Sequence, residues 1–554
     1  MAALHARRRA PELNITMAVK GLLGKCGCTR MVQGGYNVAL APDDSVERHF
    51  MDTVEGGKWL NHQELAWALV TGAQTCIREL ESAYGCFFDR NPDGTIHQKA
   101  FAGQSFDRTV HKGDLTGIEI INRLAEQVWA CGINRLEDHR AVALIKTADG
   151  TQLAGVLMID MRTGEFVFAQ TKAVLLGTGG GPTMYKYHTP SGDKSCDGMA
   201  MALQTGLVLR DMEMVQFHPT GLLAGPDTRM TGTVLEEGLR GAGGYLLGGD
   251  GERFMPKYDP QAERATRDIV SRAMINEIRC GNTSPLGGLY LQLSHLGPEN
   301  VRSQFKGMVE RCADCGFDLA GGRVEVVPTA HYMMGGVVFD LDCTTTLPGL
   351  FAAGEDTGGV HGANRLGGNG VANATVFGRI AGDEMASWAA ATGAFLMPDK
   401  NAIDQAMRQS RRPLNRPAGT IEPIRERLYN VMWDDVGIIR DAEGLKRAKA
   451  VLTELDDELE STGVSGSALA FNVTWHDWLN LKNLILVSLA ITEAALAREE
   501  SRGAHYRADF STTGDLASSA FTRTLFTDGT IVVDTERVHF TRVKPGETLL
   551  ANNH

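Results

Sequence analysis

Two histidines and two arginines in this chain could together bind and protonate a small dicarboxylic acid. His218 lies in the run QFHPTG, His331 in PTAHY, Arg365 in HGANRLG and Arg267 in TRD. A dicarboxylate needs a cationic or hydrogen-bond-donating group at each carboxylate, and chemistry at the neighbouring carbon needs a proton donor. Each residue alone also has a structural interpretation. A histidine beside a proline is often structural, and an arginine followed by Asp268 often lies on a solvated helix face.

The composition predicts a multidomain globular protein that binds no nucleic acid. A length of 554 residues exceeds what one core usually supports, so we expect about two to four domains. The formal net charge is -12, and the only basic run, Arg7-Arg8-Arg9, is short. The ten cysteines are dispersed, with only Cys26/Cys28 and Cys312/Cys315 close together, so we expect no disulfide framework, no iron–sulfur cluster and no metal site in this chain.

The sequence predicts no membrane span. The most apolar stretch, Leu484 to Ala497, is shorter than the roughly 18 residues that a span requires and is interrupted by Glu493. The N-terminus has no apolar signal-peptide core after its arginines. We therefore expect a cytoplasmic protein, or one held at the cytoplasmic face of the inner membrane by partner subunits.

Two apolar runs that open into glycine-rich loops indicate an α/β, dinucleotide-binding fold. Ala173 to Leu176 leads into GTGGG, and Leu350 to Ala353 leads into Gly354-Glu355-Asp356. Buried strands of a dinucleotide-binding sheet end in this way, although a plain glycine-rich turn explains the first run equally well. These signals flank a central block, and helical patterns such as Asp477 to Arg498 dominate after about residue 400. We expect a nucleotide-binding domain at 1–219 and 341–400, an inserted α+β domain at 220–340 and a helical domain with a tail at 401–554.

The complete G-x-G-x-x-G loop that opens a Rossmann-type domain is missing from the sequence. The chain instead starts with a helix-like segment, Ala2 to Arg9, and a strand-like segment, Leu13 to Lys20, which resemble the second half of an opening βαβ unit. We expect either that Met1 is internal to a longer natural chain, that the chain is a fragment, or that phosphate is bound in another way.

Several long motifs occur in an order that resembles the succinate dehydrogenase/fumarate reductase flavoprotein family. The resemblance spans residues 13 to 545 and rests on CTRMVQGG from Cys28, CDGMA from Cys196, FHPTG from Phe217, EGLRG from Glu237, HGANRLG from His361 and ESRGAH from Glu500. It implies a Rossmann-type FAD-binding domain whose first β-α unit is absent, an inserted capping domain and a C-terminal helical domain.

The resemblance also implies roles for individual residues. Arg267 matches the proton-delivering arginine, and Glu237 and Arg240 match the relay that leads to it. The positions that match substrate contacts are His218, Glu236, His331 and Arg365. The positions that match FAD contacts are Lys20, Cys28, Thr29, Gln33, Gly34, Gly35, Gly179, Gly180, Asp197, Glu355 (at the ribose), Gly370 and Val371.

Two departures from the family pattern change these expectations. Many members attach FAD through a histidine at the position of Cys28, so we expect noncovalent FAD, a weaker flavin oxidant and a bias toward fumarate reduction. Glu236 stands where members have a threonine that helps to hold a substrate carboxylate. Two carboxylates repel each other unless one is protonated or turned away, which leaves the identity of the dicarboxylate open.

We therefore expect an FAD-dependent oxidoreductase that interconverts fumarate and succinate, with Arg267 as proton donor and acceptor. An L-aspartate oxidase-like enzyme is the first alternative; it would carry an acidic residue where this chain has Phe101. A truncated, flavin-free chain that only binds partners is the second. The resemblance implies electron exchange with a separate iron–sulfur subunit, with a membrane-anchor subunit beyond it, or with a soluble carrier or oxygen.

Overall fold

The nucleotide-binding part is built around two short parallel sheets. The computed structural model describes residues 1–466 and 468–550. Strand β1 (Thr16–Ala18) pairs in parallel with β5 (Asn134–Leu136), and β9 (Val174–Leu176) pairs in parallel with β16 (Leu350–Ala352). The strands expected from the apolar runs are therefore confirmed. The first helix, α1, covers Ala2–Arg9, as predicted.

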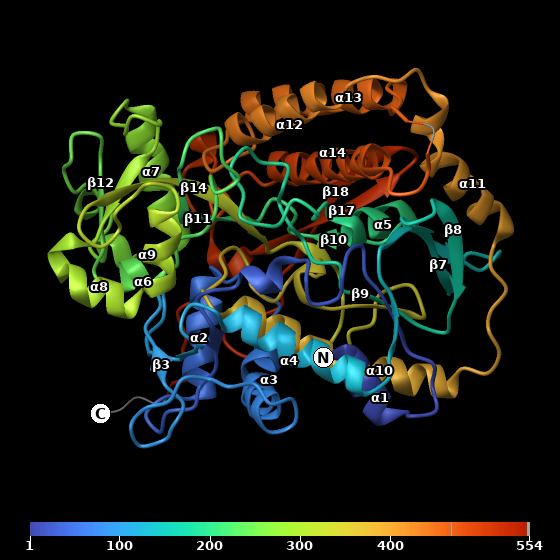
Figure 1. Cartoon of the computed structure of the whole chain (residues 1–554), viewed down its shortest axis with the longest axis horizontal. Coiled ribbons are helices and arrows are strands. Elements are labelled where there is room, and N and C mark those ends of the chain that lie inside the picture. Colours follow the sequence, from blue (N-terminus) through green and yellow to red (C-terminus); the bar gives the residue numbers. More distant parts are fainter. Residues whose placement is uncertain (467, 551–554) are drawn as a thin grey trace.

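Two long helices, α3 (Gln63–Ser82) and α10 (Asn369–Ala391), pack against each other beside these sheets. In Figure 1 they lie in the lower half of the molecule with α1, α2 (Val46–Gly56) and α4 (Thr116–Ala130). Helix α3 buries a stripe at three- and four-residue spacing, which is the apolar face of an amphipathic helix. The stripe consists of Leu65, Leu69, Ala73, Ile77 and Leu80.

An antiparallel meander precedes β9 and lies on the right-hand side of the molecule in Figure 1, next to α11 (Lys400–Ser410). Its strands are β6 (His139–Lys146), β7 (Leu153–Asp160) and β8 (Glu165–Gln170). The turns at Asp149-Gly150 and Arg162-Thr163-Gly164 separate them, as the sequence predicts.

The central block forms the left-hand lobe of Figure 1 and has its own hydrophobic cluster, which runs from Leu222 to Val326. Its antiparallel sheet has the order β11-β14-β13-β12. The strands are β11 (Val215–Leu222), β12 (Tyr245–Leu247), β13 (Leu289–Gln292) and β14 (Arg323–Met333), and the helices are α6 (Gly238–Gly241), α7 (Arg267–Arg279), α8 (Pro298–Gln304) and α9 (Lys306–Ala313). The α+β character expected of the inserted block is confirmed; its boundaries stay a prediction.

Helices dominate the region after residue 400 and form the upper layer in Figure 1. They are α11 (Lys400–Ser410), α12 (Glu422–Asp434), α13 (Ala442–Ser461) and α14 (Val473–Ala497). Helix α14 is long and apolar enough to cross a membrane by length and composition alone, contrary to the expectation from the shorter apolar stretch. However, 61% of its most apolar window is buried, so its apolar residues serve the core that it shares with α12 and α13.

The C-terminal region, predicted as a helical domain with a tail, also contains strands. Strands β17 (Ala520–Thr527) and β18 (Thr530–Arg537) form a hairpin. The hairpin extends a sheet of order β15-β10-β17-β18, in which β10 is Leu209–Arg210 and β15 is Gly336–Val337. The last domain is thus joined by backbone hydrogen bonds to strands far away in the sequence.

Candidate active site

A buried arginine at the start of α7 is the centre of the site. Arg267 is only 6% exposed, and Asp268 beside it is 7% exposed, which excludes the solvated helix face considered above. The Arg267 guanidinium donates from Nη2 to Glu237 Oε2 at 2.6 Å and from Nη1 to Gln216 Oε1 at 2.9 Å. Because one carboxylate and one amide hold it from two sides, the guanidinium has a fixed orientation.

A second arginine continues this network away from Arg267. Arg240 Nη2 donates to Glu237 Oε1 at 3.2 Å, and its Nη1 donates to the carbonyl of Glu263 at 2.7 Å. Burial works to raise the pKa of Glu237, but the charges of Arg267 and Arg240 outweigh it and the pKa is lowered. An ionised carboxylate thus bridges two arginines, as the expected relay requires.

Two neutral histidines from neighbouring strands lie on the same side of the site. His218 on β11 and His331 on β14 face each other edge to face, with ring centroids 5.4 Å apart. Burial, followed by the nearby charge of Arg267, lowers the pKa of both rings well below the ordinary value, so both are uncharged at neutral pH. The hydroxyl of Thr189 lies 2.7 Å from His331 Nδ1 and orients that ring. Both histidines can therefore donate a hydrogen bond without adding charge.

Arg365 is the second buried cation of the site. Its guanidinium carbon lies 4.3 Å from the centroid of the Tyr332 ring, a cation–π contact. Burial, then repulsion by Arg267, lowers its pKa to about 10, so it remains charged at pH 7. Its buried Nε has no hydrogen-bond partner among the residues that the structure describes. A buried charged donor without a partner suits a ligand carboxylate.

Glu236, expected near a substrate carboxylate, is turned toward a lysine. Its Oε2 lies 3.2 Å from Lys99 Nζ, and the carboxylate is 3% exposed. Burial raises the pKa of Glu236, and Lys99 opposes that rise. Lys99 was not among the predicted site residues. By pairing with Glu236, it reduces the repulsion between this carboxylate and a substrate carboxylate.

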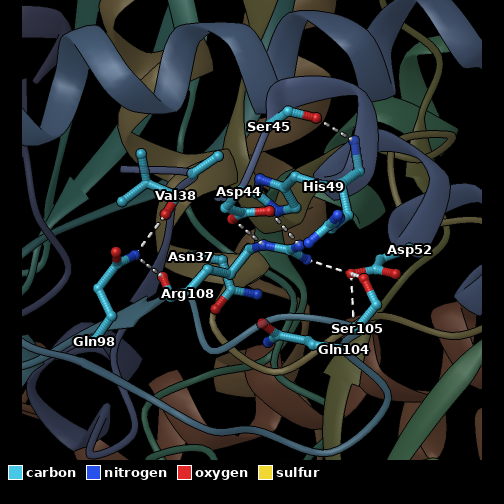
Figure 2. A network of polar contacts seen from close by, with 12 residues as sticks. Asn37, Val38, Asp44, Ser45, His49, Asp52, Gln98, Gln104, Ser105 and Arg108 are labelled. Carbon is cyan, nitrogen blue, oxygen red and sulfur yellow. Dashed lines mark hydrogen bonds and ion pairs between the residues drawn. The ribbon is translucent and has the colours of Figure 1, made fainter. Parts of the chain in front are cut away.

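A polar network fixes the segment that carries Phe101 (Figure 2). The buried guanidinium of Arg108 makes two bonds of 3.0 Å to Asp44 and also contacts Asp52, which accepts from both the backbone and the hydroxyl of Ser105. On the other side of the segment, Gln104 Nε2 donates to the carbonyl of Gly367 at 3.0 Å.

Gly367 belongs to the loop that presents Arg365, and Asn37 Nδ2 also donates to its carbonyl at 2.5 Å. A Cβ at Gly367 would lie 2.7 Å from the Phe101 ring and 3.1 Å from Arg267 Nη2. Glycine at position 367 therefore leaves room for both the Phe101 ring and the Arg267 guanidinium.

Three residues expected at FAD, Gly179, Gly180 and Glu355, lie where β9 and β16 end. Glu355 Oε1 accepts from the backbone N–H of Met333 at 3.0 Å, and a Cβ on Gly180 would lie 2.9 Å from the same oxygen. Burial raises the pKa of Glu355 to about 7, so its carboxyl can donate a hydrogen bond to a ribose hydroxyl. Gly179 donates to Asp356 at 2.8 Å. Glycine-rich loops at the carboxyl ends of parallel strands can bring their backbone close to a dinucleotide cofactor.

Three other segments carry residues that are expected at FAD. Helix α10 starts at Asn369, so the N–H groups of Gly370 and Val371 lie in its first turn, where the helix dipole is positive. Cys28 and Thr29 begin a short 3-10 helix and are half-buried, and burial raises the pKa of Cys28 to about 12. Gly34 and Gly35 accommodate close contacts, since a Cβ on Gly34 would lie 2.5 Å from the Phe101 ring.

Three predicted cofactor residues, Lys20, Asp197 and Gln33, contact other protein groups. Lys20 Nζ lies 2.7 Å from Asp197 Oδ2, and Arg140 Nη2 lies 3.0 Å from Asp197 Oδ1. Burial opposes ionisation of Asp197, but Arg140 and Lys20 prevail and lower its pKa. Gln33 Nε2 donates to the carbonyl of Val234 at 3.1 Å, while its buried Oε1 has no partner within the described part of the chain. The FAD-contact roles of these residues stay predictions.

Sequence reasoning missed Gln216, Lys99 and Gln104 as parts of the site. Gln216 lies two residues before His218, in the motif that drew attention to the histidine. Strand β11 is irregular between Gln216 and Phe217 and again after His218, and such bulges re-aim side chains beside active sites. No sequence signal pairs Lys99 with Glu236, because their contact is made between distant segments.

Comparison with known proteins agrees with this geometry. The model of the FAD binding domain family matches residues 1–371, and that of the fumarate reductase flavoprotein C-terminal family matches residues 425–549. The chain is 40% identical over 513 residues to one of the subunits of the fumarate reductase (CoM/CoB) from Methanothermobacter marburgensis, covering 90% of each chain. It is 34% identical over 512 residues to L-aspartate oxidase 2-a of Nicotiana tabacum, covering 87% of this chain and 76% of the relative.

Among solved structures, that of E. coli quinol fumarate reductase FrdA matches with a TM-score of 0.92 and 32% sequence identity. The match covers 99% of this chain and 96% of that one. The chain length, the matched family models and the overall fold agree with these relatives. The chain therefore belongs to the succinate dehydrogenase/fumarate reductase flavoprotein family and is an FAD-dependent oxidoreductase.

Proposed function

We propose that this chain interconverts fumarate and succinate, or a closely related C4 dicarboxylate, and works mainly in the direction of fumarate reduction. The observation that carries the proposal is the buried Arg267, held by Glu237 and Gln216 beside two neutral histidines and the buried cation Arg365. Two cationic groups and two neutral donors suit a substrate with two carboxylates and an alkene between them.

In this mechanism His218, His331 and Arg365 bind the two carboxylates and polarise the alkene. FAD, when bound, supplies the hydride that goes to one alkene carbon. Arg267 donates a proton to the other carbon, and Glu237 and Arg240 return a proton to Arg267 through their hydrogen-bonded contacts. Succinate oxidation is the reverse sequence, in which Arg267 accepts the proton.

The site favours fumarate or succinate over L-aspartate, which carries an ammonium group beside its two carboxylates. Phe101, where an acidic residue would suit a substrate ammonium, is 6% exposed and lies against Gly34 and Gly367. Glu236 is a nearby carboxylate, but Lys99 already pairs with it. Lys99 and Glu236 balance each other's charge, so an ammonium would lie beside Arg267 and Arg365 without a free carboxylate, at a cost of several kcal/mol in a buried site.

We further propose noncovalent FAD and a separate iron–sulfur partner subunit. Cys28, at the position where many members carry a flavin-linked histidine, has a pKa of about 12 and is a poor nucleophile for covalent attachment. The M. marburgensis relative is named as one subunit of its enzyme, which supports an assembly here as well. Through such partners the chain would act in the cytoplasm or at the cytoplasmic face of a membrane.

The test is a flavin reoxidation experiment. The visible spectrum of the purified protein is recorded before and after denaturation, and the anaerobically reduced protein is then mixed with fumarate. We expect a flavin spectrum that denaturation releases into solution and rapid reoxidation by fumarate. Reduction of the oxidised protein by L-aspartate without reoxidation by fumarate would instead support the L-aspartate oxidase alternative, and absence of flavin would support the partner-binding one.

A further inference from the structure

One half-buried lysine beside the FAD region has no assigned role. Lys194 follows Ser191 in a turn closed by a 2.9 Å backbone bond, and its carbonyl accepts from the Thr183 hydroxyl at 2.7 Å. Its Nζ donates to the carbonyl of Thr178 at 2.9 Å, in the loop that follows β9. The ammonium is thus anchored at the carboxyl end of a parallel strand, the place where open α/β sheets bind phosphate-bearing ligands.

The hydrogen-bonding capacity of this ammonium is largely unused by the protein. An ammonium has three donors, and the Thr178 carbonyl satisfies one of them. Within residues 1–466 and 468–550, no carboxylate lies close enough to Lys194 to form an ion pair. A partly buried charge that makes no direct ion pair is costly, so a ligand that supplies a negative group within contact distance is favoured there.

Glycines keep the space around the ammonium free of side chains. A Cβ on Gly27 would lie 3.5 Å from Lys194 Nζ, and one on Gly179 would lie 3.8 Å from it. Both glycines have positive φ, 83° and 78°, which ordinary side chains disfavour. A Cβ on Gly181 would collide with the side chain of Lys194 itself. Backbone from two distant segments therefore approaches the ammonium closely, as in loops that cradle phosphate.

The charges around Lys194 keep it protonated. Burial works to lower the pKa of Lys194, but the nearby groups of Cys28, Asp193, Asp356 and Glu355 outweigh burial and raise it. Glu355 and Asp356 follow β16, the parallel partner of β9. Lys194 therefore lies between the segment that carries Cys28 and the carboxyl ends of β9 and β16.

We propose that the Lys194 ammonium pairs with the diphosphate of FAD and anchors the cofactor noncovalently in this chain. A lysine binds phosphate as a point charge, and the diphosphate can form the direct ion pair that no carboxylate of the described residues forms with Lys194. The proposal rests on FAD as the cofactor and is independent of the dicarboxylate, so failure of the fumarate assay would leave it testable.

The experiment measures FAD affinity rather than turnover. Flavin-depleted Lys194→Met, Lys194→Arg and unchanged protein are titrated with FAD, with binding followed by flavin fluorescence at several salt concentrations. We expect Lys194→Met to weaken FAD binding by about 10- to 100-fold, as for loss of a charge-assisted contact. Lys194→Arg should restore most of the affinity. The control is Lys186→Met, which removes an exposed lysine eight residues away and should bind FAD like the unchanged protein.

Two further measurements test the proposal: the salt dependence of FAD affinity and the midpoint potential of the flavin. FAD affinity of the unchanged protein should fall with added salt, a measurement that needs no variant. In a folded Lys194→Met protein the fall should be less steep. The flavin midpoint potential should be the same in both proteins. Unchanged FAD affinity in a folded Lys194→Met variant would overturn the proposal. A shifted potential with unchanged affinity would also overturn it, since the ammonium would then lie at the flavin ring.

Discussion

Replacing Arg267 with alanine tests the proposed proton donor most directly. The substitution removes the hydrogen bonds to Glu237 and Gln216 and leaves Glu237 with Arg240 as its remaining cationic partner. A positioned general acid contributes about 10²- to 10⁴-fold to a rate, which corresponds to ~2.7 to 5.4 kcal/mol of activation free energy. We expect the reoxidation of reduced flavin by fumarate to slow by that factor.

The assay is anaerobic stopped-flow mixing of reduced protein with fumarate, followed at the flavin absorbance. Arg267→Lys keeps the charge but cannot reproduce the two-sided guanidinium contact, so it should recover about a tenth of the lost rate or less. Arg264→Ala is the matched control, because Arg264 is exposed and only three residues away. A folded, FAD-containing Arg267→Ala protein that is reoxidised within about threefold of the unchanged rate would refute the assignment.

Three other predictions concern the surroundings of this arginine. Glu237→Gln should slow reoxidation by about tenfold or more with FAD affinity unchanged, because the amide cannot carry a proton between Arg267 and Arg240; an equal rate in stopped flow would exclude the relay. Lys99→Met should lower the free energy of unfolding in urea by about 1–3 kcal/mol and the double variant Lys99→Met/Glu236→Gln by less, since only the single variant leaves a buried carboxylate unpaired; additive losses would contradict the pairing. His331 has a lowered folded-state pKa, so the unfolded chain binds the extra proton and stability falls as pH drops below about 6.5, by at most ~1.4 kcal/mol per pH unit for this residue. His331→Asn should therefore lose less thermal stability between pH 7 and pH 5 than the unchanged protein, and parallel losses would show that this ring does not titrate as described.

Local sequence patterns predicted much of the fold. The apolar runs before glycine loops located β9 and β16, and the helix at Ala2–Arg9 was expected with the same bounds. The C-terminal hairpin was missed although its signal is present: Asp528-Gly529 separates two alternating runs, and both residues have positive φ, as a two-residue hairpin turn requires. The dominant helical pattern around it masked this short-range signal.

The candidate site was only partly predictable. His218, His331, Arg365 and Arg267 stand out by type and motif, but their separation in sequence says nothing about the partners that orient them. The ion pair between Lys99 and Glu236 depends on how the inserted lobe packs on the nucleotide-binding part. The bond from Arg267 to Gln216 depends on how α7 packs on β11 within the lobe. Such contacts between distant segments follow from tertiary packing rather than from any local propensity.

The hairpin also has a consequence for the behaviour of the protein at high concentration. Strand β18 is the outer strand of its sheet, so one row of its backbone N–H and C=O groups lacks a neighbouring strand within the described chain. Free edges invite pairing with the same edge of another molecule and lead to aggregation. Asp534, Glu536 and Arg537 place charges along this strand, and bringing two such edges together would oppose like charges and strip water from them. The acidic and basic side chains of β18 thus act as a solubility device, independent of any role in catalysis.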